Sequence, residues 1–335
     1  METFMNISTN NAKVLAHWYV TTRCNSRCRT CSIWRDPSYN CSESILESKV
    51  QLLYQLKQLG FLSIDFTGGE PLLYPHLPDL LKQARNLGIM TWVTTNGLLY
   101  KKQALALKGL VSQLSFSLDS PISEINDRIR GIKHFKKAIS AMKYAIGLGE
   151  LPMIKATVCN ENVGHLNKFA KLAQKLGVLI EFNAEFTYFG NEPLNKDGIN
   201  EILKIRKHPN VIVSMPHLQF MKDGGNNPQR PKCHIGRNII AIAPDNSLYY
   251  PCMHMNRKKI PLEKESIRKT LFNMNKKGLL DKIGRFSFCN KCTIPCFMEP
   301  SYYTQIDKYF LKCYLGRMDY LKKRMKLNLT HKFHR

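Results

Sequence analysis

Between residue 16 and about residue 215, short apolar runs alternate with longer stretches in which apolar residues recur every three or four positions. The runs are typical of buried strands, and the stretches are typical of helices. This alternation favours successive β-α units around a parallel sheet. We expect strands at residues 17–22, 63–67, 90–94, 113–118, 153–158, 180–186 and 211–214, and helices at residues 44–59, 76–87, 101–107, 135–148 and 166–176.

About six such units predict an α/β fold, a partial (β/α)6 TIM-like barrel whose site lies at the carboxyl ends of the strands. The sequence Gly-Gly-Asn-Asn-Pro at residues 224–228 interrupts this pattern with turn-forming residues. We therefore expect an N-terminal segment at residues 1–15, the barrel at 16–215, a smaller C-terminal domain at 216–316 and a basic tail at 317–335.

Composition indicates a globular chain. Of its 335 residues 44% are apolar, which is enough for a large core. No apolar run reaches the ~18 residues of a membrane span, and the first fifteen residues lack the pattern of a secretion signal. We expect a cytoplasmic protein, in which eleven cysteines point to metal binding rather than to disulfides.

The charge is strongly basic, with 50 Lys and Arg against 25 Asp and Glu, a formal net charge of +25. Such a balance favours anionic partners such as nucleic acid, a phosphorylated substrate or a membrane surface. In the tail, Leu321, Met325 and Leu329 recur at intervals of four, which predicts a basic amphipathic helix. We expect it to pack on the domain or fray, and a membrane or RNA contact is the alternative.

Three cysteines, Cys24, Cys28 and Cys31, follow the first predicted strand. Four cysteines close a [4Fe–4S] cluster, whereas three leave one iron open to a ligand. Their spacing differs from that of electron-carrying ferredoxins and from the paired CxxC of structural zinc sites. On spacing alone, a zinc site or unligated thiols remain the alternatives.

The triplet resembles the cluster motif of the radical S-adenosylmethionine (radical SAM) superfamily, in which the open iron binds the amino and carboxylate groups of SAM. Four further segments at or after successive strand ends extend the resemblance: Thr-Gly-Gly-Glu-Pro at 67–71, Thr-Thr-Asn-Gly at 94–97, Ser-Phe-Ser-Leu-Asp-Ser at 115–120 and Asp-Arg-Ile-Arg-Gly at 127–131. Taken alone, the paired glycines are an ordinary turn that lets backbone approach a ligand closely.

The resemblance implies a [4Fe–4S] cluster on the three cysteines and a bound SAM. The residues that would contact SAM are Gly68, Gly69, Glu70, Thr95 and Ser117. In that family the residue before the third cysteine is usually aromatic and packs near the adenine. Here it is Thr30, and Trp34 is the nearby ring that could take its place.

Three polar residues are candidate catalytic groups. Lys155 lies on the fifth strand, where relatives place groups that reach the substrate or SAM, and its alternative is a surface lysine. Glu185 at the sixth strand either lines the barrel or points outward. His254 is a candidate acid or base, with packing or support of the neighbouring cysteine as the alternative.

A second set of cysteines follows residue 216. It resembles the SPASM or twitch extension of radical SAM enzymes, which carries auxiliary [4Fe–4S] clusters. Six cysteines complete one cluster and leave a second open, so we expect at least one; zinc on Cys289, Cys292 and Cys296 is the alternative. The candidate ligands are Cys233, Cys252, Cys289, Cys292, Cys296 and Cys313.

The resemblance implies an enzyme that cleaves SAM reductively and abstracts hydrogen from a C–H bond of a peptide or a biosynthetic intermediate. The auxiliary cluster would assist electron transfer or substrate binding, and the electron donor would be a flavodoxin or ferredoxin. The first strand begins near residue 16, so we expect any leader-peptide-binding module to be a separate protein. The alternatives are an RNA- or lipid-modifying enzyme of the same superfamily and a non-catalytic iron–sulfur electron carrier.

Overall fold

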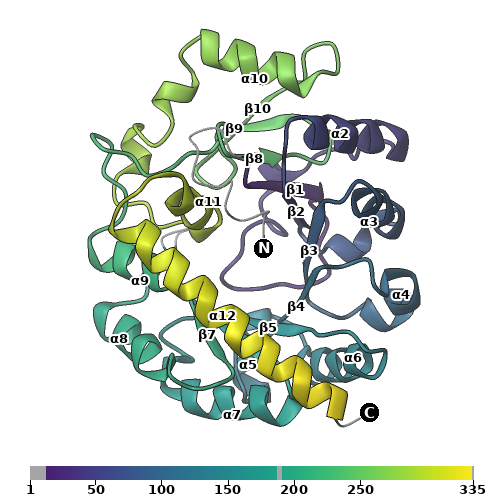
Figure 1. Ribbon diagram of the computed structural model, residues 1–335, viewed down its shortest axis with the longest axis vertical. Coiled ribbons are helices and arrows are strands. Elements are labelled where there is room, and N and C mark those ends of the chain that lie inside the picture. Colours follow the sequence, from purple (N-terminus) through teal and green to yellow (C-terminus); the bar gives the residue numbers. More distant parts are fainter. Residues whose placement is uncertain (1–12, 187–190, 334–335) are drawn as a thin grey trace.

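A computed structural model describes residues 13–186 and 191–333. Within these ranges ten strands form one sheet in the order β10-β9-β8-β1-β2-β3-β4-β5-β6-β7. Neighbours from β8 through β1 to β7 are parallel, and β9 is antiparallel to both β8 and β10 (Figure 1). The strands are β1 (Leu15–Thr21), β2 (Ser63–Gly68), β3 (Met90–Thr95), β4 (Gln113–Ser117), β5 (Met153–Val158), β6 (Leu179–Ala184), β7 (Val211–Val213), β8 (Ile239–Ile242), β9 (Leu248–Cys252) and β10 (Asn256–Ile260).

The α-helices within these ranges are α2 (Leu46–Gln58), α3 (Leu77–Asn86), α4 (Tyr100–Leu107), α5 (Ser123–Arg130), α6 (Phe135–Gly147), α7 (Leu166–Leu176), α8 (Lys196–Ile205), α9 (Met215–Lys222), α10 (Ile267–Lys276), α11 (Pro295–Ser301) and α12 (Lys308–Phe333). Helices α2, α3, α4, α6, α7 and α8 lie along the outer side of the curved sheet (Figure 1). The predicted α/β partial barrel is confirmed, and the sheet remains open.

The core follows from the apolar periodicity. All seven residues of β1 are buried, as expected for a strand covered on both faces. In α3 the buried residues are spaced three and four positions apart, which turns one apolar face toward the sheet. They are Leu77, Leu80, Leu81 and Ala84.

Helix α5 was missing from the predicted elements. Its sequence, Ser-Glu-Ile-Asn-Asp-Arg-Ile-Arg, offers only two aliphatic residues, so its periodicity is weak. It ends at Gly131 in the left-handed conformation, with φ of 68°, where glycine carries no steric penalty.

The C-terminal region continues the barrel sheet. Strand β8 pairs in parallel with β1, placing Leu15 beside Ile239 and Trp18 beside Ile242. Residues 243–247 connect the antiparallel strands β8 and β9. One continuous sheet therefore links the two predicted domains, and the boundary near residue 216 stays a prediction.

The predicted tail helix is the last part of α12, which begins at Lys308 rather than at residue 317. It crosses the face of the molecule seen in Figure 1 and contacts α9. The Lys323 ammonium donates to the carbonyl oxygens of Arg206 and Val211, which supports packing rather than fraying. Of the predicted N-terminal segment, residues 1–12 lie outside the described residues.

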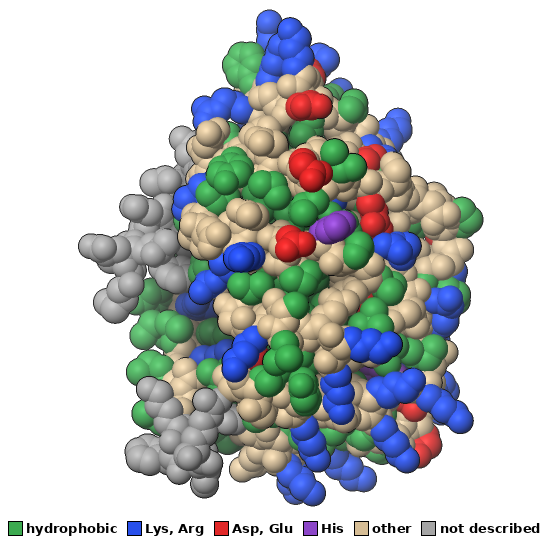
Figure 2. Space-filling view, turned by 90° about the vertical axis from the view of Figure 1, so that its right-hand side faces the viewer, with side chains coloured by type: hydrophobic (Ala, Val, Ile, Leu, Met, Phe, Trp, Pro, Cys, Tyr) green, Lys and Arg blue, Asp and Glu red, His purple; other side chains and the backbone are tan. Residues whose placement is uncertain are grey.

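Lysine and arginine side chains are spread over the face drawn in Figure 2, most densely in its lower part. No helix within the described ranges is both long and apolar enough to cross a membrane.

Candidate functional site

The three cysteines of the first motif lie in the loop that leaves β1. Burial raises the pKa of Cys24 to about 11 and that of Cys31 to about 12, and the Cys28 thiol adds to both rises, so the sulfurs lie near one another. The Ser26 backbone N–H donates to the Cys24 sulfur at 3.4 Å, and an Arg130 guanidinium nitrogen to the Cys28 sulfur at 3.5 Å. Such donors stabilise thiolate ligands of an iron–sulfur cluster, so this donor set fits one.

The paired glycines fit against the start of this loop. A Cβ atom on Gly68 would lie 1.9 Å from the Thr21 carbonyl oxygen, and one on Gly69 would lie 2.2 Å from that of Arg23. Both contacts are far inside van der Waals distance, so only glycine is accommodated. The Gly69 N–H donates to the Thr21 carbonyl at 3.0 Å, and the Glu70 N–H to the Arg23 carbonyl at 2.8 Å. The backbone that these glycines approach is therefore that of the cysteine loop.

Glu70 is buried and its carboxylate is held by donors within the chain. It accepts hydrogen bonds from the Thr95 hydroxyl at 2.6 Å, the Asn96 N–H at 2.7 Å and the Leu72 N–H at 3.1 Å. Burial nevertheless raises its pKa. Glu70 and Thr95 are thus brought together, and they link the ends of β2 and β3.

Asn96 joins this pair to the cysteine loop. Its side-chain amide donates to the Asn25 side-chain oxygen at 2.7 Å and to the Ser26 hydroxyl at 3.0 Å. The sequence placed Asn96 in a motif without giving it a role. Its position directly after a strand and before a glycine is the signal that could have identified it.

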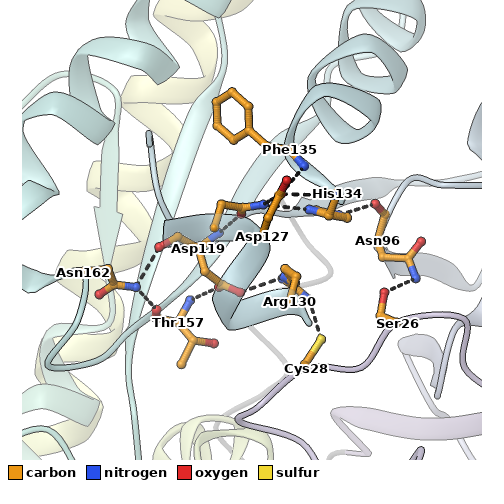
Figure 3. Close-up of polar contacts among 11 residues, drawn as sticks. Ser26, Cys28, Asn96, Asp119, Asp127, Arg130, His134, Phe135, Thr157 and Asn162 are labelled. Atoms are coloured by element: carbon orange, nitrogen blue, oxygen red, sulfur yellow. Dashed lines mark hydrogen bonds and ion pairs between the residues drawn. The ribbon is translucent and has the colours of Figure 1, made fainter. Parts of the chain in front are cut away.

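Arg130 is a second residue that the sequence motif contained without a role. Its Nε lies 2.7 Å from the buried carboxylate of Asp119, while the same guanidinium reaches Cys28 (Figure 3). The other Asp119 carboxylate oxygen accepts from the Thr157 N–H at 2.9 Å, and Asn162 donates to the Asp119 carbonyl at 2.7 Å. Strands β4 and β5 therefore fix the cation that faces the cysteine sulfur.

Asp127 and His134 hold the segment around Arg130 in place. Asp127 accepts from the backbone N–H groups of His134 at 3.0 Å and Phe135 at 2.7 Å, capping α6. His134 Nε2 donates to the Asn96 carbonyl at 2.7 Å (Figure 3). Burial, together with the nearby Arg130 charge, lowers the pKa of His134 to about 4, so the ring is neutral at pH 7.

Three further residues predicted to contact SAM are Thr30 and Trp34, which lie in the segment after β1, and Ser117 at the end of β4. The Trp34 indole N–H donates to the Cys28 carbonyl at 3.0 Å, and the Arg27 guanidinium lies 5.2 Å from the ring centre. The Thr30 carbonyl accepts from Asn191 at 3.1 Å. Ser117 is the last residue of β4 and pairs in register with Lys155.

Comparison with known proteins agrees with this geometry. A family model described as the radical SAM superfamily matches residues 18–173. A GTP 3',8-cyclase of Petrotoga mobilis is 31% identical over 218 residues, covering 63% of this chain and 67% of the relative. The chain belongs to the radical SAM superfamily. Membership implies a [4Fe–4S] cluster and SAM binding.

Other similarities are more distant. An AdoMet-dependent heme synthase of Oleidesulfovibrio alaskensis is 28% identical over 166 residues, and the match spans 49% of this chain and less than half, 43%, of that relative. Among solved structures, Streptococcus suis SuiB matches with a TM-score of 0.63 at 18% identity, over 88% of this chain and 74% of SuiB. The protein anSMEcpe matches with a TM-score of 0.60 at 16% identity, over 96% and 100%. At these identities the structures support the fold alone.

Four cysteines of the second set line one cavity in the described part of this radical SAM chain. Its sulfur-bearing walls come from Cys233, Cys252, Cys289 and Cys292. Burial raises the pKa of Cys233 well above its ordinary value, and the other three thiols add to the rise. The backbone N–H of His254 donates to the Cys252 sulfur at 3.3 Å. This donor set fits a four-iron cluster.

Among the described residues, no three His, Cys, Asp or Glu side chains converge as the ligands of one metal ion would. Zinc requires sulfur ligands about 2.3 Å from one point, whereas each cysteine of a four-iron cluster binds a different iron.

Asn226 holds two walls of this cavity together. Its side-chain amide donates to the carbonyls of Gly284 at 2.8 Å and Cys289 at 3.0 Å, and its side-chain oxygen accepts from the Lys232 N–H at 3.0 Å. Its own N–H donates to the Cys292 carbonyl at 2.9 Å. The sequence marked this residue only as part of a turn-rich break, because its long-range partners leave no local signal.

The two remaining predicted ligands lie elsewhere. Cys313 is buried in an aromatic cluster with Phe220, Tyr302 and Tyr309. Cys296 is the second residue of α11, and its sulfur lies near Lys155, Asp65 and Glu299. Four of the six predicted ligands therefore line the cavity, whereas Cys296 and Cys313 lie outside its lining, in apolar clusters against which Cys233 and Cys292 also pack.

The predicted catalytic residues occupy three different surroundings. The Lys155 ammonium lies 3.7 Å from the Glu181 carboxylate, which raises its pKa. Glu185 follows β6; it is buried, and burial raises its pKa. The His254 ring packs against Phe297 with 5.2 Å between ring centres, and burial lowers its pKa to about 3. The charges that act on Glu185 come from Arg29 of the cysteine loop and from Asp119.

Proposed function

We propose that this protein is a radical SAM enzyme in which Cys24, Cys28 and Cys31 hold the cluster that cleaves SAM. When bound, cluster and SAM together supply a 5′-deoxyadenosyl radical, which abstracts hydrogen from a C–H bond. The observation that carries this proposal is the loop of three thiols at the carboxyl end of β1, with nitrogen donors directed at two of the sulfurs.

The chain's own residues position and seal this site. Gly68 and Gly69 let β2 approach the cysteine loop, and Asn96 ties that loop to the end of β3. Exclusion of water matters because a reactive radical otherwise attacks whatever it touches. The apolar cluster that includes Tyr19 and Tyr249, against which Cys31 packs, provides such a wall.

The test is anaerobic reconstitution with iron and sulfide, followed by addition of dithionite and SAM. We expect 5′-deoxyadenosine from the wild type and none from a variant in which Cys24, Cys28 and Cys31 are all alanine. A wild-type protein that carries intact clusters but forms no 5′-deoxyadenosine would contradict the proposal and favour an electron carrier.

We further propose that Cys233, Cys252, Cys289 and Cys292 hold one auxiliary [4Fe–4S] cluster. Their common cavity supports this assignment. Reconstituted wild type should contain about eight irons per chain, four in each cluster. Alanine at Cys252 and Cys289 should halve this number, whereas alanine at Cys313, the matched buried cysteine, should leave it unchanged. Iron loss in the Cys313 variant would contradict the four-cysteine assignment.

The substrate we propose is a peptide or a biosynthetic intermediate. SuiB has been solved with its precursor peptide SuiA, and anSMEcpe with AdoMet and a peptide, which supports the peptide class. A flavodoxin or ferredoxin is the proposed electron donor. Turnover of candidate peptides in the presence of SAM, followed by mass spectrometry, tests this choice.

A further inference from the structure

Helix α12 exposes a row of leucine and methionine side chains along most of its length. Each of them retains between 39% and 65% of its surface in contact with water. At 3.6 residues per turn, all of them lie within an arc of about 120° on the helix. We call this row the α12 stripe; it consists of Leu311, Leu315, Met318, Leu321, Met325 and Leu329.

The opposite face of α12 packs against the rest of the protein. Tyr309 and Cys313 are buried in the aromatic cluster with Phe220 and Tyr302. Further along the helix, the Lys323 ammonium donates to two backbone carbonyl oxygens. These positions lie across the helix from the stripe. The stripe is therefore not the face that holds α12 to the protein.

A continuous row of this kind differs from the other exposed apolar side chains. Ile45, Leu105 and Phe272 are also exposed, but each stands on a different segment of the chain. Apolar residues exposed singly are normal on a protein surface, whereas a contiguous apolar patch marks contact with another surface. The stripe is therefore a contact surface for a partner with apolar groups.

Basic residues border the stripe. From residue 308 to residue 329 the helix carries seven Lys or Arg and one acid, Asp319, which pairs with Lys323 at 2.8 Å. Lys322 and Lys326 are exposed and lie one helical turn from Met318 and Leu329, so they adjoin the stripe. Lysine side chains cover apolar surface with their methylene groups and keep the ammonium in water. A matching partner combines an apolar interior with negative charge at its surface.

We propose that the α12 stripe rests on the surface of a lipid bilayer with anionic headgroups. Its leucine and methionine side chains enter the boundary between headgroups and acyl chains, and the adjoining lysines lie among the headgroups. Tyr314 lies on the same arc and is exposed, and tyrosine is enriched at such interfaces. The inference goes beyond the proposed function, because it concerns the surface that the enzyme contacts rather than the reaction.

Two other occupants match the stripe less well. A second copy of this chain would bring two strongly basic helices together, and their like charges repel. RNA offers phosphates to the lysines but no apolar surface that would cover leucine and methionine side chains. The anionic bilayer matches both the apolar row and the basic border.

The second half of the stripe lies away from the cysteine loop. Lys323 donates to the carbonyl of Val211, the first residue of β7, at 2.8 Å. The cysteine loop instead follows the carboxyl end of β1, and the strands from β1 to β7 are parallel. Substitutions at the end of the stripe therefore leave the proposed SAM-cleaving site unchanged.

The test measures binding of the whole reconstituted chain to lipid vesicles by co-sedimentation. One set of vesicles contains phosphatidylcholine alone, and the other contains equal parts of phosphatidylcholine and phosphatidylglycerol. We expect the wild type to bind the mixed vesicles at least about tenfold more strongly than the neutral ones. Added salt should weaken this binding, because it screens the lysines. A wild type that binds neither set of vesicles would overturn the proposal.

The stripe is tested by the variant Leu321→Gln/Met325→Gln/Leu329→Gln. Glutamine is a good helix former and the three positions are exposed, so the fold is retained. We expect the partition coefficient on mixed vesicles to fall at least about tenfold, because the apolar contact is lost. Binding of this variant at the wild-type level would overturn the proposal.

The matched control is Ile45→Gln/Leu105→Gln/Phe272→Gln. It removes the same number of exposed apolar side chains from outside α12. We expect it to bind mixed vesicles as the wild type does. An equal loss of binding in the control and in the stripe variant would show that general surface hydrophobicity, rather than α12, attracts the protein to lipid.

The basic border is tested by Lys322→Gln/Lys326→Gln. We expect about a tenfold decrease in the partition coefficient on mixed vesicles. The control Lys82→Gln/Lys102→Gln removes two exposed lysines from α3 and α4 and should bind as the wild type does. Equal losses in the two variants would assign the attraction to net charge and contradict the role of α12.

Hydrogen–deuterium exchange of the wild type locates the contact without any substitution, and it decides the case should the stripe variant fail to fold. Mixed vesicles should protect peptides of α12; protection confined to another segment would overturn the proposal. Light scattering and binding of a mixed-sequence single-stranded RNA test the other occupants. A wild-type dimer that the stripe variant converts to a monomer, or RNA binding that the stripe variant loses, would assign the stripe to that occupant and overturn the bilayer contact.

Discussion

Arg130 donates from one guanidinium nitrogen to the sulfur of Cys28, 3.5 Å away, and forms an ion pair with the carboxylate of Asp119, 2.7 Å from its Nε. The carboxylate holds the cation in place, and the cation faces a predicted cluster ligand. A hydrogen bond to a cluster sulfur stabilises the reduced, more negative state. The sequence segment Asp-Arg-Ile-Arg-Gly at 127–131 therefore supports the cysteine loop as well as ending α5.

Loss of the Arg130 side chain should destabilise the folded protein and lower the reduction potential of the cluster on the cysteine loop. Arg130→Ala leaves the Asp119 carboxylate buried without its partner, which typically destabilises by about 3–5 kcal/mol. We expect a decrease of that order in the free energy of unfolding by urea, and a lower reduction potential for the cluster on the cysteine loop. The matched control is Arg128→Ala, whose side chain is 62% exposed and paired with Glu161, and it should cost less than about 1 kcal/mol. Equal effects of the two variants would refute this account of Arg130.

The glycine pair provides a second prediction. In Gly69→Ala the new Cβ would overlap the Arg23 carbonyl, so the cysteine loop must move. We expect loss of the iron bound by the loop while the auxiliary cluster is retained. Gly147→Ala is the control, because a Cβ there meets nothing within 4 Å. A Gly69→Ala protein with full iron content would show that the close approach is unimportant.

The stability that Lys49 contributes should depend on pH. It is completely buried; its ammonium donates to the Pro244 carbonyl at 2.6 Å and faces the rings of Trp18 and Tyr74. Burial lowers its pKa from 10.5 to about 8. Between these values the unfolded chain binds more protons than the folded one, so this group makes stability rise with pH.

The measurement is the difference in unfolding free energy between wild type and Lys49→Met. Between pH 8 and pH 10.5, the unfolding free energy of the wild type should rise by about 3 kcal/mol relative to that of Lys49→Met. Other groups that titrate in this range cancel in the comparison. A difference that stays constant with pH would show that Lys49 titrates normally.

The packing of α12 is tested at Lys323. Its side chain is 13% exposed and donates to two backbone carbonyls. Lys323→Ala removes both hydrogen bonds and should destabilise by about 1–3 kcal/mol. The exposed neighbour Lys322 serves as control, because Lys322→Ala should change stability by less than about 0.5 kcal/mol. If both variants were neutral, α12 would not be held by this contact.

The strands of the barrel were predictable because strands covered on both faces are continuous apolar runs, as in β1. Helix α5 was not predictable, because its two isoleucines, Ile125 and Ile129, are too few to reveal a helical repeat of apolar residues. The site on the cysteine loop was predictable in outline from its spacing. The contacts of Asn96 and Arg130 with that loop were not, because they depend on which strand ends become neighbours.

The C-terminal cysteines show in the same way that contacts between distant residues cannot be predicted from local sequence. Spacing could not tell which of six thiols share a cavity. Pro295 begins α11 directly before Cys296, and Cys296 lies outside the lining of the cavity. Likewise, the pairing of His17 with Asp65 follows from the register of β1 and β2, which no local pattern encodes.

The central claim is that the three-cysteine loop leaves one iron open to SAM. The most direct test is the electron paramagnetic resonance spectrum of the dithionite-reduced variant Cys252→Ala/Cys289→Ala, recorded with and without SAM. This variant should retain only the cluster on the loop, and addition of SAM should shift its g-values. A spectrum that does not change on addition of SAM would contradict the claim.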